Sequence, residues 1–308
     1  MSKIKTIVIF LLLSSRFFSQ NIDSIYSSIS SINNDSVKIY KILAEIVNPL
    51  IDKRDFLKAD AELKKAKKFI NGNVNNEFRF KSAGIQLLIS QEKYDAANDS
   101  IELQLTKAKK LNNNYYLSNF LRYKALIQLY LGNLDKSTEI YFTALKKMKL
   151  TNFQNGIAMA YSDIGMVSYY NEQFDKAAEF WEKSAEIYEK ENRKDFLSNE
   201  LSNLSLAYLD NNNLVKAERV LKKALALANE LKSENSKASI YTNFTKLEYN
   251  KKNLTKAIEY NDLAAKYYES IKNYDKLSNI YSNGAELART NKQYNEALAY
   301  IKDRKSVV

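Results

Sequence analysis

Apolar residues recur every three to four positions along most of this chain, the spacing that places them on one face of an α-helix. The clearest case is residues 153–170, FQNGIAMAYSDIGMVSYY, which are followed by the polar turn NEQ and by a second amphipathic stretch from Phe174 to about Glu191. Two such stretches joined by a short polar turn predict a helical hairpin. Matching turns stand at LGN (131–133), NNN (211–213), KKN (251–253) and NKQ (291–293). We therefore expect an all-α chain of antiparallel helix pairs.

The second helix of each expected pair opens with one pattern, which occurs seven times. An apolar or aromatic residue comes first, and a small residue follows three places later. The small residues are Ala59, Ala97, Ser137, Ala177, Ala217, Ala257 and Ala297. They are 40 residues apart, except for a first step of 38. A fixed period of this size predicts stacked units, none of which can bury its apolar face alone.

The residues at these positions resemble the tetratricopeptide repeat family. Its pattern of Leu-Gly, a small residue, an aromatic residue and a second small residue is met by Ile164-Gly165, Ala177, Trp181 and Ser184. The resemblance covers about residues 37–302 and implies a right-handed superhelical solenoid of about seven helical hairpins. The chain departs from the family because the closing proline is missing and the period is 40 instead of 34. Longer helices would account for both differences, and HEAT-like repeats are the alternative.

The amino terminus has the pattern of a secretory signal peptide. Within residues 1–19, lysines precede an unbroken apolar run from Ile7 to Leu13, and small and polar residues follow it. We expect export, to the periplasm or to the extracytoplasmic face of the inner membrane. Arg16 and Phe17 suit a cleavage region poorly, so an uncleaved anchor is the alternative. Residues 20–36 are a Ser/Asn-rich lead-in, in which Asp35 or Ser36 is placed to cap the next helix.

The last six residues, DRKSVV (303–308), do not fit the repeat. Position 304 should hold the small residue that recurs at Ala144, Ser184, Ala224 and Ala264, but it holds Arg304. A guanidinium buried without a partner in the packing seam between paired helices would cost several kcal/mol. The six residues also match the translation of a common sequencing-library adapter. We therefore expect residues 303–308 to be an artefact, and the natural chain to continue toward a membrane span and an output domain.

Composition limits the chemistry that the chain can perform. It has no cysteine and no histidine, which excludes disulfides, thiol chemistry, most zinc sites and every histidine-based acid or base. It also has no glycine-rich phosphate loop and no nucleophile motif. We therefore expect no cofactor, no metal and no catalysis.

The net charge of +11 makes a polyanion site an alternative to consider. The lysines, however, stand mostly late in the expected helices, as in KKAKK (64–68) and KKMK (146–149), where they complement the helix dipole. A solvated face is the simpler interpretation, and nucleic acid is not the expected partner.

In tetratricopeptide repeat proteins, the first helix of each hairpin lines a concave groove that holds a peptide or a partner helix. The resemblance therefore implies groove positions on the first helices, among them a polar column of Ser, Thr and Asn that could grip an extended peptide backbone. The alternative is that these side chains only satisfy neighbouring backbone, and that the tyrosines pack between helices. The candidate residues are Arg122, Tyr130, Ser162, Tyr169, Tyr170, Ser202, Asn203, Thr242, Asn243, Tyr249, Ser282 and Asn283.

The sequence predicts a non-catalytic repeat scaffold that binds a peptide or protein. By its resemblance to exported repeat arrays, it is expected to be the extracytoplasmic sensory part of a truncated bacterial signalling regulator. The alternatives are a free-standing periplasmic scaffold and the repeat region of an enzyme whose catalytic domain is missing.

Overall fold

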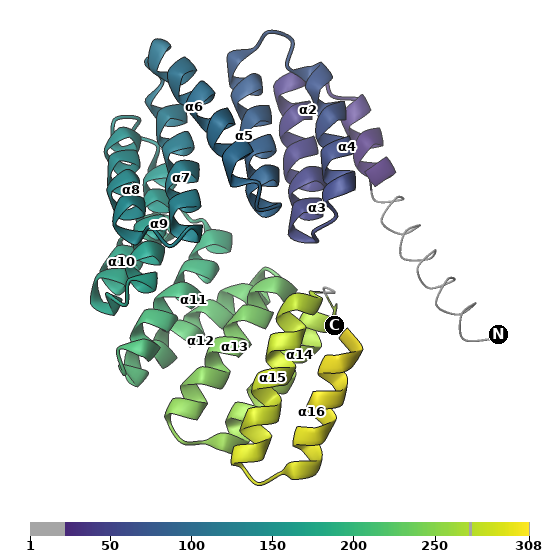
Figure 1. The fold of residues 1–308 in the computed structure, drawn as a ribbon, viewed down its shortest axis with the longest axis vertical. Coiled ribbons are helices and arrows are strands. Elements are labelled where there is room, and N and C mark those ends of the chain that lie inside the picture. Colours follow the sequence, from purple (N-terminus) through teal and green to yellow (C-terminus); the bar gives the residue numbers. More distant parts are fainter. Residues whose placement is uncertain (1–21, 271–272, 308) are drawn as a thin grey trace, which may run out of the picture. The chain divides into compact units, whose positions relative to one another are not determined.

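The computed structural model describes residues 22–270 and 273–307, and the regular structure within these ranges is helical throughout (Figure 1). The chain divides into two compact units, Met1–Ile127 and Gln128–Val308. The predicted signal peptide, residues 1–19, lies outside the described residues. The expected fold class, an all-α solenoid of helical hairpins, is confirmed, while the handedness of the array stays a prediction.

The first unit begins with residues 22–30, which are helical and pack Ile29 into its core. A longer helical stretch, residues 35–52, then contains the chain's one proline, Pro49, with a π-helical segment before it. A proline inside a helix lacks an N–H donor and crowds the carbonyl of the preceding turn, which accounts for the widened segment. The elements are α2 (Asp35–Lys41), η1 (Ile42–Val47), α3 (Asn48–Asp52), α4 (Phe56–Ala66), η2 (Lys67–Phe69), α5 (Val74–Ser90), α6 (Tyr94–Lys110) and α7 (Asn114–Tyr130).

The cap that opens α2 differs from the prediction. The side chain of Asn34 accepts hydrogen bonds from the backbone N–H groups of Ser36 and Val37, at 2.9 and 3.2 Å. Asp35 is already the first helical residue, where its charge favours the positive end of the helix dipole. The cap was therefore placed one or two residues too late, because several adjacent residues in this polar segment have capping side chains.

The second unit is more regular, and α9 through α15 have 17 residues each. Consecutive helices pair as hairpins, as the alternating directions of the helices in Figure 1 show. The elements are α8 (Leu134–Lys149), α9 (Gln154–Tyr170), α10 (Phe174–Lys190), α11 (Lys194–Asp210), α12 (Leu214–Glu230), α13 (Glu234–Asn250), α14 (Leu254–Ser270), α15 (Tyr274–Thr290) and α16 (Tyr294–Val307).

Most turns between helices use a residue other than glycine in the left-handed conformation. Glu172, Asn192, Asn212 and Lys232 have φ between 52° and 56°. The residue after each of them donates its N–H to a carbonyl in the last turn of the preceding helix, as Gln173 does to Ser168 at 2.9 Å. This arrangement ends a helix by satisfying a carbonyl that has no partner within it. Asparagine adopts this conformation readily, whereas lysine and glutamate do so at a cost.

The predicted packing seam is confirmed. The small residues of the pattern are buried: Ala177, Ala217 and Ala257 are 0% exposed, and Ala297, in the last described hairpin, is 7% exposed. The side chain of Trp181, 3% exposed, fills the space above Gly165. Small residues let the paired helices approach, and the large residues fill the space that is left.

Arg304 does not carry the cost of a buried guanidinium in this structure. Arg304 is exposed on α16 and its Nη1 lies 3.4 Å from the Ser282 hydroxyl oxygen. The seam position is covered in earlier hairpins by the hairpin that follows, and no later hairpin lies within the described residues to cover Arg304. The origin of residues 303–308 stays a prediction.

Candidate partner-binding face

The first helices of the second unit, α9, α11, α13 and α15, present a row of side chains that are at least partly exposed. We call this row the first-helix face. It recurs along each helix at intervals of three and four residues, the spacing of one helical face. Its members are Asn155, Met159, Ser162, Asp163, Met166 and Tyr170 on α9, Asp195, Asn199, Asn203, Leu206 and Asp210 on α11, Asn235, Ser239, Thr242, Lys246, Tyr249 and Asn250 on α13, and Asn279, Ser282, Asn283, Glu286 and Thr290 on α15.

Most of the predicted groove residues of the second unit belong to this face. Tyr170 and Tyr249 are 61% and 45% exposed, and Asn283 is also exposed. The partly buried members are Ser162, Asn203, Thr242 and Ser282, whereas Tyr169 is partly buried outside this face. Arg122 and Tyr130 lie on α7, which crosses from the first unit into the second, and the Tyr130 ring is 57% exposed.

Two of the predicted groove residues are not available to a partner. Ser202 and Asn243 are 4% and 5% exposed. The Asn243 side-chain amide nitrogen lies 2.9 Å from the Ser202 carbonyl oxygen, 3.0 Å from the Ser202 hydroxyl oxygen and 3.1 Å from that of Ser205. Asn243 therefore joins α13 to α11. The prediction treated adjacent residues as one column, but neighbours on a helix point about 100° apart, so one residue of a pair can be buried while the other is partly exposed, as in Thr242 and Asn243.

Tyr169 also has a structural role. Its hydroxyl donates to Asp210 Oδ2 at 2.5 Å, and Lys246 Nζ lies 2.6 Å from the other oxygen of the same carboxylate. Partial burial and the hydrogen bond to Asp210 raise the pKa of Tyr169. The carboxylate thus links α9, α11 and α13 at one end of the first-helix face. Tyr170, whose ring packs edge-on to that of Tyr169 with centroids 6.1 Å apart, is the more accessible of the two.

Glu200 on α11 is a buried carboxyl that the sequence analysis did not identify. It is 4% exposed, and its Oε2 accepts a hydrogen bond from the Ser162 hydroxyl at 2.9 Å. Burial, reinforced by the charge of Asp163, raises the pKa of Glu200 to about 8, although the nearby hydroxyls of Ser162 and Ser184 act in the opposite direction. The carboxyl is therefore largely neutral at pH 7.

The repeat contained the signal that could have revealed Glu200. At steps of 40 residues, the same position of the other first helices holds an apolar residue. These residues are Phe80, Phe120, Ala160, Ile240 and Ile280. A single acidic residue in an apolar column indicates either a buried carboxyl or a local change in packing, and the structure shows the former.

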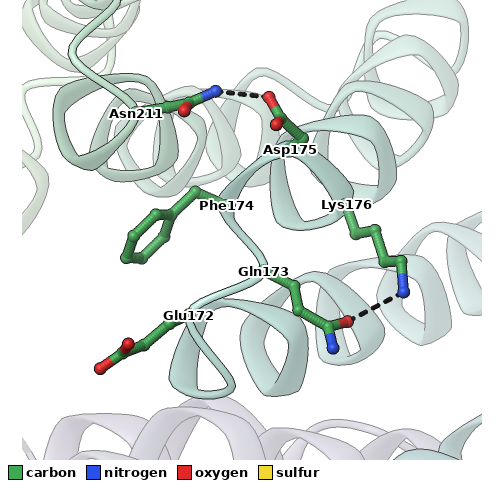
Figure 2. Close-up of a pocket in the computed structure, with 6 residues that line it drawn as sticks. All are labelled: Glu172, Gln173, Phe174, Asp175, Lys176 and Asn211. Atoms are coloured by element: carbon green, nitrogen blue, oxygen red, sulfur yellow. Dashed lines mark hydrogen bonds between the residues drawn. The ribbon is translucent and has the colours of Figure 1, made fainter.

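A shallow cavity of about 280 Å³ lies where the turn between α9 and α10 meets the end of α11 (Figure 2). Four of its polar side chains are paired with one another: Asn211 donates to Asp175, and Lys176 donates to Gln173 at 3.1 Å. A second cavity, of about 460 Å³, lies in the first unit among α4, α5 and α6. Neither cavity is lined by residues of the first-helix face.

Within residues 22–270 and 273–307 there is no group of three or more acidic side chains placed to hold a metal ion. The same ranges contain no helix with the length and apolar character needed to span a bilayer.

Comparison with known proteins agrees with this fold. Residues 156–230 match the tetratricopeptide repeat family. No protein of curated function matches the sequence. The predicted tetratricopeptide repeat pattern is thus confirmed for residues 156–230.

Solved structures with this fold are distant in sequence. A Rap protein complexed with competence and sporulation factor is 16% identical, with 88% of this chain and 76% of that chain covered and a TM-score of 0.66. Aspartyl phosphate phosphatase F from Bacillus subtilis is 17% identical, with 95% and 90% covered and a TM-score of 0.58. A signal transduction ATPase with a tetratricopeptide repeat sensor, PH0952 from Pyrococcus horikoshii, is 18% identical, with 85% of this chain and 41% of that chain covered and a TM-score of 0.55.

Proposed function

We propose that this chain of tetratricopeptide repeats is an exported scaffold that binds an extended peptide, or a segment of a partner protein, along the first-helix face of its second unit. Its role would be sensory, as the extracytoplasmic part of a bacterial signalling regulator. The observation that carries the proposal is the chemistry of the first-helix face, which is polar but mostly uncharged.

The polar members of the face suit a peptide backbone. Asn203, Thr242, Ser282 and Asn283 lie on three successive first helices and are at least partly exposed. Asparagine side chains both donate and accept hydrogen bonds, so they can pair with the N–H and C=O groups of an extended chain. A row of such side chains across neighbouring helices offers contacts whose strength does not depend on the partner's charge.

The apolar members of the face suit the side chains of that peptide. Met159 and Met166 are partly exposed on α9, and the ring of Tyr170 is 61% exposed on the same helix. Methionine adapts its shape to irregular apolar groups, and tyrosine is enriched where proteins meet. Asp163 is the one charged residue in the sequence of α9. We therefore expect the partner to present apolar side chains, and not a row of charges, to α9.

Two further observations support the exported, sensory part of the proposal. The pattern of residues 1–19 is that of a signal peptide. In PH0952, whose fold is similar, a tetratricopeptide repeat region is the sensor of a signal transduction ATPase.

The binding proposal is tested by selecting peptides from a displayed random library against the full chain. Affinities of the enriched peptides are then compared between the unmodified protein and the double variant Asn203→Ala/Asn283→Ala. We expect a loss of about tenfold or more with unchanged circular dichroism, since a few hydrogen bonds contribute about 1 kcal/mol each. Lys256→Ala, an exposed change on the second helix α14, is the matched control and should leave affinity unchanged.

The opposite pattern would favour a polyanion partner. If Lys256→Ala and other second-helix lysine changes weakened binding, with a steep dependence on salt, while the asparagine changes did not, the proposed face would be wrong. Export is tested separately by fusing residues 1–20 to a reporter that is active only outside the cytoplasm. Deleting residues 7–13 should abolish its signal, and retention of the intact fusion in the cytoplasm would contradict export.

A further inference from the structure

Glu200 lies directly beneath the first-helix face. Its Oε2 accepts from the hydroxyl of Ser162, a member of that face, and the backbone carbonyl of Ser162 accepts from Trp181 Nε1 at 3.1 Å. Trp181 lies on α10, Ser162 on α9 and Glu200 on α11. One serine therefore connects the buried carboxyl to the core tryptophan, and the three helices meet at this point.

The surroundings of Glu200 are suited to a neutral carboxyl and poorly suited to a carboxylate. From α9 the charged group that acts on it is Asp163, which repels a negative charge, and α10 contributes the hydroxyl of Ser184. Helices α12 and α13 also pack against α11, and within the described residues they supply no group that shifts the pKa of Glu200. Glu200 Oε1 and Ser184 Oγ are both buried, and neither completes a hydrogen bond of ordinary geometry.

Ionisation would therefore require solvent. A buried carboxylate without a cation is unfavourable unless water reaches it or the packing opens. Ser162 and Asp163 are partly exposed, so we expect water to reach Glu200 from the first-helix face between α9 and α11. Hydration from that side would break the contact of Ser162 with Glu200 and move the helices that carry Met159, Met166 and Asn203.

We propose that Glu200 is a proton-operated switch beneath the first-helix face: its neutral form holds α9 against α11, and loss of its proton separates them and weakens peptide binding there. The consequence for binding rests on the function proposed above, whereas the conformational step does not. The two can therefore fail independently.

The conformational step is tested without a partner, because the chain contains a single tryptophan. The fluorescence of Trp181 in the full-length chain is followed from about pH 6 to about pH 9 under tryptophan-selective excitation. We expect an emission change with a midpoint near the pKa of Glu200, about 8. Glu200→Gln, which keeps the shape of the neutral acid, should abolish this transition.

Three variants test whether this transition belongs to Glu200. Asp163→Asn removes the neighbouring negative charge and should move the midpoint to lower pH. Glu179→Gln makes the same chemical change as Glu200→Gln, but at an exposed position of α10, and should titrate like the unmodified chain. If Glu200→Gln does not fold, Glu200→Ile gives the residue found at the equivalent positions 240 and 280 and should also lack the transition.

Amide hydrogen exchange shows where the chain opens when Glu200 loses its proton. Near the upper end of the pH range, peptides from α9 and α11 should exchange faster in the unmodified chain than in Glu200→Gln at the same pH, while peptides from α14 should not differ. The proposal is overturned if Trp181 emission is constant over this range, or if Glu200→Gln retains the same transition.

Discussion

Gly165 and Trp181 are in such close contact that a side chain at position 165 has no space. A Cβ atom built on Gly165 would lie 2.6 Å from Trp181 Cδ1 and Nε1. Real Cβ atoms do not approach other atoms so closely, so the indole ring or helix α9 would have to move. The ring is held by the hydrogen bond from its Nε1 to the Ser162 carbonyl, at 3.1 Å.

Gly165→Ala should therefore destabilise the protein although alanine is the better helix former. We expect a loss of about 1 to 3 kcal/mol in the free energy of unfolding, the usual cost of overpacking a core. Urea titration followed by circular dichroism measures it, and Trp181 fluorescence should change in the native state. Gly84→Ala on α5 is the matched control, because the nearest atom to its added Cβ, Leu63 Cδ2, is 3.7 Å away. That variant should gain about 0.5 to 1 kcal/mol from helix propensity. Equal effects of the two substitutions would contradict the packing argument.

The fold could be predicted from the sequence because small residues recur at a fixed period along the chain. Ala177, Ala217 and Ala257 stand 40 residues apart and are fully buried, so the period alone located the seam between paired helices. The candidate site was harder to predict. Exposure on a helix depends on a rotation of about 100° per residue, and the spacing does not fix where the boundary of the exposed face falls. Asn203 and Asn243 occupy the same position in successive repeats, yet the first is partly exposed and the second is buried.

Asn243→Ala should consequently cost stability, whereas Asn203→Ala should not. The Asn243 amide donates toward three oxygen atoms of Ser202 and Ser205, and its removal takes a buried donor from all three, although the Ser205 hydroxyl still donates to the Ser202 carbonyl. We expect a loss of about 1 to 3 kcal/mol for Asn243→Ala and a change within about 0.5 kcal/mol for Asn203→Ala. Thermal unfolding of both variants under identical conditions makes the comparison. If the two melted at the same temperature, the hydrogen-bonded link between α11 and α13 would contribute nothing to stability.

Lys232→Gly should stabilise the turn between α12 and α13. Lys232 is exposed and has φ of 52°, a left-handed conformation that is unfavourable for a side chain with a Cβ. Glycine adopts it freely, and the net gain should be about 0.5 to 1 kcal/mol after the entropy of the unfolded chain is included. Ala226→Gly, at an exposed position inside α12, is the opposite control and should lose about 1 kcal/mol. A rise in melting temperature for Lys232→Gly and a fall for Ala226→Gly are expected in calorimetry, and a fall for both would disprove the turn argument.

The stability of the protein should fall as the pH rises toward the pKa of Glu200. That pKa is raised from an ordinary value of 4.5 to about 8, so the folded chain binds this proton more tightly than the unfolded chain does. The contribution of protonated Glu200 to the stability of the fold is complete below about pH 4.5 and is lost progressively as the pH increases to about 8. Each unit of pKa difference corresponds to about 1.4 kcal/mol.

Glu200→Ile should remove this dependence, because isoleucine has no proton to lose and stands at the equivalent positions 240 and 280. The free energy of unfolding of Glu200→Ile should exceed that of the unmodified chain by more at about pH 8 than at about pH 5. The excess grows because only the unmodified chain loses, as the pH rises, the stabilisation that comes from protonated Glu200. Other groups titrate equally in both chains, so subtracting one urea titration from the other at each pH isolates the contribution of Glu200. A gain that does not change with pH would show that Glu200 is already ionised in the folded protein, and that its carboxylate is stabilised by water or by a cation.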